Sequence, residues 1–192
     1  LIRRLETNRD CAMRRLMLLR HAKTETDAPS GRDQDRQLDK RGRRDAAEIG
    51  AWMGGHPPFP GLVLVSRAVR AHQTWEIVWE AMKDLAPEPR VELMPELYGA
   101  DPSQLLQIVR AASEADPRRL MIVGHNPGMH ELALALAGSG DAAGRKALTD
   151  NLPTSGLAGL DFDIDDWADV AFRGGKLVLF VSPKLLKQSP DA

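Results

Sequence analysis

Short apolar runs alternate with helical patterns along the first 138 residues, and this alternation constrains the fold more than any other feature. Three runs are mostly apolar, as is typical of strands covered on both faces: "LMLL" (16–19), "GLVLVS" (61–66) and "RLMIVGH" (119–125). Apolar residues at helical spacing occupy 40–53, 67–82, 102–115 and 127–138. We therefore predict an α/β fold, a three-layer α/β/α sandwich with a mostly parallel central sheet.

The remaining segments extend this pattern toward the C-terminus. "RVELMPELYGAD" (90–101) predicts a short extended segment and a loop. "SGLAGLDFDI" (155–164) and "KLVLFVSP" (176–183) predict two strands, which we expect to pair antiparallel.

The composition fits one globular domain without a strong preference for charged partners. The chain has 192 residues, of which 43% are apolar and 28% charged, and its net charge of −1 gives no general attraction to nucleic acid or membrane. No apolar run reaches the length of about 18 residues that crosses a bilayer. Cys11 is the single cysteine, so we expect no intrachain disulfide and a cytoplasmic location. We interpret residues 1–12 as an N-terminal extension and 13–192 as a single domain.

Basic and histidine side chains follow three of the predicted strands at the point where each strand ends. They are Arg20 and His21 after the first run, Arg67 and Arg70 after the second, and His125 after the third. The carboxyl ends of parallel strands meet at one edge of a sheet, where ligands bind in open α/β folds. We therefore expect these five side chains to form one site.

This set of side chains suits a phosphoryl group. Arginine donates bidentate hydrogen bonds to phosphate and stays charged, and helices that begin after Ser66 and Asn126 add backbone N–H donors. A neutral imidazole can attack phosphorus, and neighbouring arginines keep one imidazole neutral. We expect His125 to remain protonated and to neutralise the phosphoryl oxygens.

Four segments together resemble the histidine phosphatase superfamily, also called phosphoglycerate mutase-like. They are "LLRHAK", "SRAVRAHQT" and "VGHNPG", in this order, and "DRQLDKRGRRDA". The similarity is greatest to the compact SixA-type phosphohistidine phosphatases, which carry Arg-x-Leu-(Thr or Asn)-x-x-Gly before their first helix. The resemblance implies a phosphoglycerate mutase-like fold and identifies residues 13–192 as a single histidine phosphatase domain.

The resemblance also implies roles for individual residues. His21 matches the nucleophile, and Ala22 stands where the wider family has glycine. The other matches are Arg20 and Arg70 as phosphate-binding arginines, His125 as the second histidine, Glu96 as the general acid with Glu92 as the alternative, and Arg36 and Arg67 as further phosphate-binding candidates.

These matches predict a metal-independent phosphatase that acts on protein phosphohistidine and needs no cofactor. No acidic residues at ligand spacing flank either histidine, so we predict no metal site. The short link between Leu97 and Pro102 predicts an open site, suited to a phosphorylated phosphocarrier protein or phosphotransfer domain. Two alternatives remain: a phosphatase for small phosphomonoesters, and a non-catalytic module that binds phosphate or phosphoproteins. The retained His21 argues against the module, because binding alone requires only the arginines.

Overall fold

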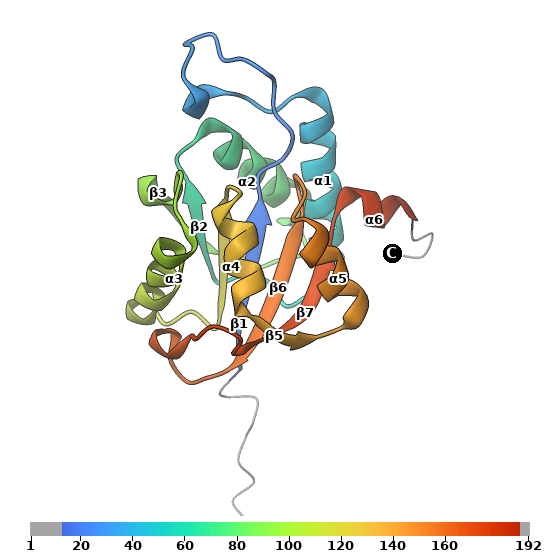
Figure 1. Cartoon of the computed structure of the whole chain (residues 1–192). Coiled ribbons are helices and arrows are strands. Elements are labelled where there is room, and N and C mark those ends of the chain that lie inside the picture. Colours follow the sequence, from blue (N-terminus) through green and yellow to red (C-terminus); the bar gives the residue numbers. More distant parts are fainter. Residues whose placement is uncertain (1–12, 189–192) are drawn as a thin grey trace, which may run out of the picture.

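The computed structural model describes residues 13–188, and Figure 1 shows the whole chain as a cartoon. The predicted extension, residues 1–12, lies outside the described residues. The strands are β1 (Met13–Arg20), β2 (Leu62–Ser66), β3 (Arg90–Met94), β4 (Arg119–Gly124), β5 (Ala137–Gly140), β6 (Leu157–Asp163) and β7 (Gly175–Val181). The helices are α1 (Lys40–Gly55), α2 (Val69–Met82), α3 (Pro102–Ala111), α4 (Gly128–Leu136), α5 (Ala142–Asp150) and α6 (Pro183–Gln188).

The strands form one seven-stranded sheet in the order β3-β2-β4-β1-β6-β7-β5. Strands β3, β2, β4 and β1 run parallel, whereas β6 pairs antiparallel with both β1 and β7. The predicted mostly parallel sheet and the antiparallel C-terminal pair are therefore confirmed. The pattern of β1 explains the middle position of this strand, because both of its faces are apolar and both are covered.

Helices cover the two faces of the sheet and make the three predicted layers (Figure 1). Successive residues of β1 point to opposite faces, since side chains alternate along a strand. Leu16 and Leu18 enter the core beneath α3 and α4, and Met17 and Leu19 enter the core beneath α1 and α2. No helix among residues 13–188 is long and apolar enough to cross a membrane.

Two details of the C-terminal half differ from the sequence prediction. The helix expected to continue to residue 138 ends at Leu136, and Ala137–Gly140 forms β5 beside β7. The sequence of β5 is "AGSG", which has no β-branched or aromatic residue, so only its pairing with β7 makes it a strand. Helix α5 was not predicted either, although Asp141 caps its first turn by accepting from the Gly144 N–H.

The parallel register aligns the strand ends that carry the candidate site. Arg20 of β1 lies beside Gly124 of β4, and Val65 of β2 lies beside Val123 of β4. The residues that follow these pairs, His21, Ser66 and His125, therefore leave the sheet at the same edge. The segment 22–39 arches over this edge before α1 begins (Figure 1).

Candidate active site

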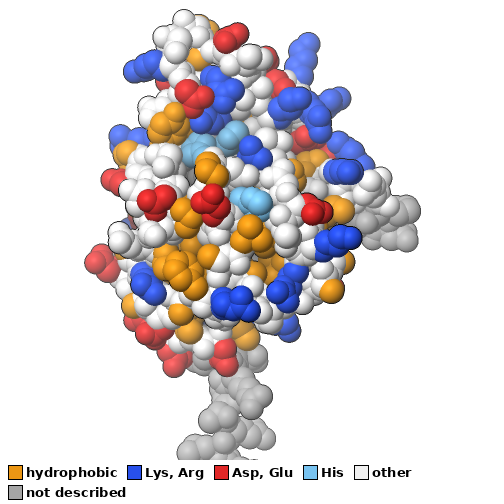
Figure 2. Space-filling model, in the orientation of Figure 1, with side chains coloured by type: hydrophobic (Ala, Val, Ile, Leu, Met, Phe, Trp, Pro, Cys, Tyr) orange, Lys and Arg blue, Asp and Glu red, His pale blue; other side chains and the backbone are white. Residues whose placement is uncertain are grey.

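Two histidines meet where β1 and β4 end. The ring centroids of His21 and His125 are 5.1 Å apart, and each residue is only 8% exposed. Arg20 comes from the last position of β1, and Arg70 comes from the first turn of α2. We call Arg20, His21, Arg70 and His125 the floor of the site. On the face drawn in Figure 2, histidine side chains reach the surface close to Lys or Arg side chains.

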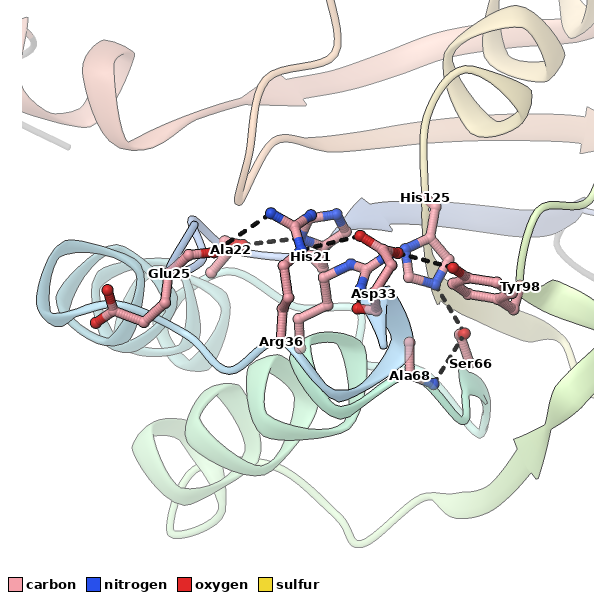
Figure 3. A network of polar contacts seen from close by, with 10 residues as sticks. His21, Ala22, Glu25, Asp33, Arg36, Ser66, Ala68, Tyr98 and His125 are labelled. Atoms are coloured by element: carbon pink, nitrogen blue, oxygen red, sulfur yellow. Dashed lines mark hydrogen bonds and ion pairs between the residues drawn. The ribbon is translucent and has the colours of Figure 1, made fainter. Parts of the chain in front are cut away.

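The backbone fixes the tautomer of His21. Its Nδ1 lies 2.8 Å from the carbonyl oxygen of Ala22 (Figure 3). A carbonyl oxygen can only accept, so Nδ1 carries the proton and Nε2 keeps a free lone pair. The Ala22 N–H in turn donates to Oγ1 of Thr74 at 2.9 Å, and this hydrogen bond fixes Ala22 against α2. The geometry therefore prepares Nε2 of His21 as a base or a nucleophile.

Burial keeps His21 neutral. The pKa of His21 is lowered from 6.5 to about 4. Burial is the largest cause, and the positive charges of Arg70, Arg20 and Arg36 act in the same direction, against the hydrogen bond to Ala22. The expectation that arginines keep one imidazole neutral is thus right in direction, but loss of water is the larger cause. At pH 7 the Nε2 lone pair is available.

The side chain of Ser66 fixes His125. Ser66 Oγ lies 2.8 Å from His125 Nε2 and accepts from the Ala68 N–H at 3.4 Å (Figure 3). Ser66 is fully buried, and among residues 13–188 His125 Nε2 is the only acceptor that its hydroxyl meets. The hydroxyl therefore donates its proton to Nε2, which leaves the hydrogen of the imidazole on Nδ1. Nδ1 is buried without a partner, so it is a free donor in the site.

The expectation that His125 is protonated is wrong. Its pKa is lowered to about 3, mainly by burial and also by the neighbouring His21 and Arg70, although the Asp33 carboxylate opposes them. A positive charge on this ring would lose its hydration and face other cations. His125 is therefore a neutral N–H donor at neutral pH in this structure.

Three buried donors around the histidine pair have no hydrogen-bond partner. They are Nε of Arg20, Nε of Arg70 and Nδ1 of His125. A buried donor without a partner is costly, and a native structure retains such groups where a ligand completes them. Arg20 is held by its other end, because its Nη1 donates to the Leu152 carbonyl at 3.0 Å. The three donors suit an anion with several oxygens, such as a phosphoryl group.

A carboxylate that the sequence did not single out joins this site. Asp33 Oδ2 accepts from Arg70 Nη2 at 2.8 Å and from the Tyr98 hydroxyl at 2.7 Å, and Oδ1 accepts from Arg36 Nε at 2.9 Å. We call Asp33, Arg36 and Tyr98 the rim of the site. The hydrogen bond from Tyr98, followed by Arg70 and Arg36, lowers the pKa of Asp33 to about 2. The carboxylate is therefore charged.

The segment that carries Arg36 is anchored at several points to the body of the protein. Leu38 is buried, and Asp39 caps α1 by accepting from the Gly42 N–H at 2.6 Å. Any Cβ at Gly42 would lie 2.0 Å from the Lys23 carbonyl oxygen, so only glycine permits this close approach. The spacing of Arg36, Leu38 and Gly42 in the sequence is thus explained by the start of α1, where Asp39 caps the helix and Gly42 packs against the Lys23 backbone.

Comparison with known proteins agrees with this geometry. Residues 16–100 match the histidine phosphatase superfamily (branch 1). A solved structure named "putative phosphohistidine phosphatase SixA" from Agrobacterium tumefaciens is 32% identical over 88% of this chain and 98% of that one, with a TM-score of 0.73. The chain belongs to the histidine phosphatase superfamily.

Two further relatives are similar in sequence over most of this chain. An uncharacterized protein of Mycobacterium leprae is 34% identical, over 86% of this chain and all of that protein. A second structure with the same SixA description, from Nakamurella multipartitia, is 29% identical over 89% of this chain and 96% of that one, with a TM-score of 0.74.

Three residues predicted for this histidine phosphatase site lie outside the hydrogen-bonded network. Arg67 is exposed and makes none of the hydrogen bonds that join floor and rim within residues 13–188. Glu92 and Glu96 line a cavity of about 680 Å³ between β3 and α3, together with Met94 and Ile108. The lining of that cavity includes no floor or rim residue.

The rim and Ser66 are the parts of the site that the sequence reasoning missed, apart from Arg36. Ser66 ends a strand at the same edge as the histidines, and that signal could have identified it. Asp33 and Tyr98 lie in loops whose sequences carry no comparable signal. Among residues 13–188, no group of three or more His, Cys, Asp or Glu side chains could hold a metal ion.

Proposed function

We propose that this protein is a metal-independent phosphatase that dephosphorylates protein phosphohistidine through a phosphohistidine intermediate on His21. One observation carries the proposal. The backbone of Ala22 leaves the Nε2 lone pair of His21 free, in a buried site where Arg20, Arg70 and His125 each offer an unpartnered donor. A nucleophile beside three donors for phosphoryl oxygens is the arrangement that phosphoryl transfer requires.

The reaction has two steps. His21 Nε2 attacks phosphorus, a new P–N bond forms, and the bond from phosphorus to the substrate nitrogen breaks as that imidazole takes up a proton. Water then attacks the phosphoryl group on His21, which releases phosphate and restores the imidazole. Arg20, Arg70 and His125 hold the phosphoryl oxygens in both steps.

The remaining assignments are part of the same proposal. Arg36 and Arg67 are further phosphate-binding residues. Glu96, or Glu92 in its place, supplies the proton for leaving groups more basic than imidazole. Arginines rather than a metal ion provide the positive charge for the phosphoryl oxygens, and no cofactor takes part.

Two features support phosphohistidine as the substrate. The relatives at 32% and 29% identity carry the SixA phosphohistidine phosphatase description. Only Tyr98–Asp101 separate the turn at Leu97 from α3, so no long insertion from this connection covers the site. A phosphorylated histidine on a phosphocarrier protein or phosphotransfer domain is the partner that we propose, in a cytoplasmic setting.

The test is a substrate panel assayed in the presence of a chelator. We expect release of phosphate from a phosphohistidine-containing carrier protein, with acid-labile, base-stable phosphate trapped on His21 during turnover. Much faster hydrolysis of a sugar phosphate would favour the small-molecule phosphatase instead. Binding of the carrier without turnover would favour the non-catalytic module.

A further inference from the structure

Asp33 is held in place by three side chains, although half of it faces water. Its side chain is 51% exposed, whereas its partner Arg70 is buried. The Tyr98 ring that donates to Asp33 also packs edge-on against His125, with ring centroids 5.5 Å apart. The carboxylate thus lies between the floor and solvent, beside His21 and His125 (Figure 3).

The hydrogen bonds of Arg70 leave room for Asp33 and a phosphoryl group together. A guanidinium has five N–H donors in a fixed fork. Asp33 takes two of them at the end of the fork, because Nη1 donates to its backbone oxygen at 2.7 Å and Nη2 to its carboxylate at 2.8 Å. The buried Nε remains, because it has no hydrogen-bond partner. Arg70 can therefore donate to a bound phosphoryl group while it keeps its hydrogen bonds to Asp33.

The carboxylate also keeps capacity for a further donor. A carboxylate offers about four lone-pair sites, and Tyr98, Arg70 and Arg36 fill three of them. The remaining site is on Oδ1. A protonated leaving group next to the phosphoryl group could donate to it, whereas an anionic group there would meet a like charge.

We propose that Asp33 makes this site selective for substrates whose group next to the phosphoryl is protonated or positively charged, and selective against a second anion there. The inference rests on the proposed phosphatase function and narrows its substrate class. An imidazole that leaves as its protonated form belongs to the favoured class. A phosphate ester with a neighbouring carboxylate or second phosphate belongs to the disfavoured class.

Three benzylphosphonates of the same shape test this selectivity by calorimetry, since their C–P bond cannot be hydrolysed. One carries a 3-aminomethyl group, one is unsubstituted and one carries a 3-carboxylate. We expect Kd to rise in that order for the wild type. Asp33→Asn keeps the shape and removes the charge, so it should reduce the Kd ratio between the anionic and cationic ligands about tenfold. High salt should reduce the wild-type ratio as well, because the carboxylate is half exposed.

Asp35→Asn is the matched control. Asp35 lies in the same turn and pairs with Ser30 and Arg32 rather than Arg70, so its removal changes net charge equally and should keep the ratio. An unchanged ratio in Asp33→Asn would overturn the inference. Equal weakening of all three ligands, or no binding of any to the wild type, would overturn it too.

Turnover of the phosphohistidine carrier, measured on the same samples, separates this inference from the proposed function. Charge-selective binding without turnover would sink the phosphatase and leave the selectivity of Asp33 standing. Turnover of the carrier with no charge preference among the ligands would support the phosphatase and overturn the selectivity of Asp33.

Discussion

The floor and the rim of the site are built in different ways. The floor residues come from strand ends and the start of a helix. His21, Arg70 and His125 are buried and Arg20 is half-buried, and backbone groups, a serine hydroxyl and the Asp33 carboxylate hold them. The rim residues come from loops, and charged hydrogen bonds around the half-exposed Asp33 hold them together. Burial strengthens electrostatic interactions, whereas water and salt weaken them at the surface. The floor should therefore decide whether the chemistry occurs, and the rim should decide which substrate undergoes it.

The largest effect should come from the nucleophile. His21→Ala should reduce turnover by at least about 10³-fold, since nothing else on the floor offers an equivalent lone pair. The fold should persist, which a thermal melt would verify, because His21 lies at a strand end. His72→Ala, on the exposed side of α2, is the matched control and should retain activity. Near-normal turnover in His21→Ala would break the assignment of chemistry to the floor.

The two floor arginines should follow. Arg20→Lys and Arg70→Lys should each reduce kcat/KM by about 10²-fold or more, because lysine keeps the charge but cannot donate bidentately. Arg32→Lys, at an exposed ion pair, is the control. Full activity in both floor variants would show that a positive charge is enough to hold the phosphoryl group, without the bidentate hydrogen bonds of arginine.

A smaller but diagnostic effect concerns pH. The Nε2 lone pair of His21 should be lost only near pH 4, which an NMR titration of the ring would measure. Arg70→Met should raise that midpoint, because it removes a repelling charge. A wild-type midpoint at the ordinary histidine value of 6.5 would mean that water reaches the His21 ring and that burial does not lower its pKa.

The same burial has a consequence for stability. The folded-state pKa values of His21 and His125 are lowered, so the unfolded chain binds more protons as pH falls below 6.5. Their contribution to the free energy of unfolding is complete above that value and decreases as pH falls, toward 4 for His21 and toward 3 for His125. Denaturant melts across this window should show the decrease, and His125→Gln should make it shallower.

For phosphohistidine, the smallest expected effect lies outside both regions. If Glu96 protonates the leaving group, Glu96→Gln should slow an alkyl phosphate strongly, a nitrophenyl phosphate less and phosphohistidine only modestly. Glu92→Gln, on the wall of the same cavity, is the matched comparison. Equal losses on all three substrates would remove Glu96 as the acid, and a substrate-dependent loss in Glu92→Gln instead would transfer the role to it.

The sequence by itself determined every strand of the sheet except β5, and the main part of the floor. Uniform apolar runs followed by helical spacing specify covered parallel strands, and the ends of such strands share one edge whatever the details of packing. Arg20, His21 and His125 could be placed there because their positions depend only on strand order and direction. Arg70 followed from its position one helical turn after Ser66.

Only the tertiary structure decided the tautomers, the protonation states and the rim. The Ala22 carbonyl and the Ser66 hydroxyl set which ring nitrogen carries a proton, and burial set the charge of both histidines. Asp33 and Tyr98 are 65 residues apart and meet in loops that have no periodic pattern. The physical reason is that strand periodicity is a local property of the chain, whereas burial and loop contacts depend on what the rest of the fold brings within hydrogen-bond distance.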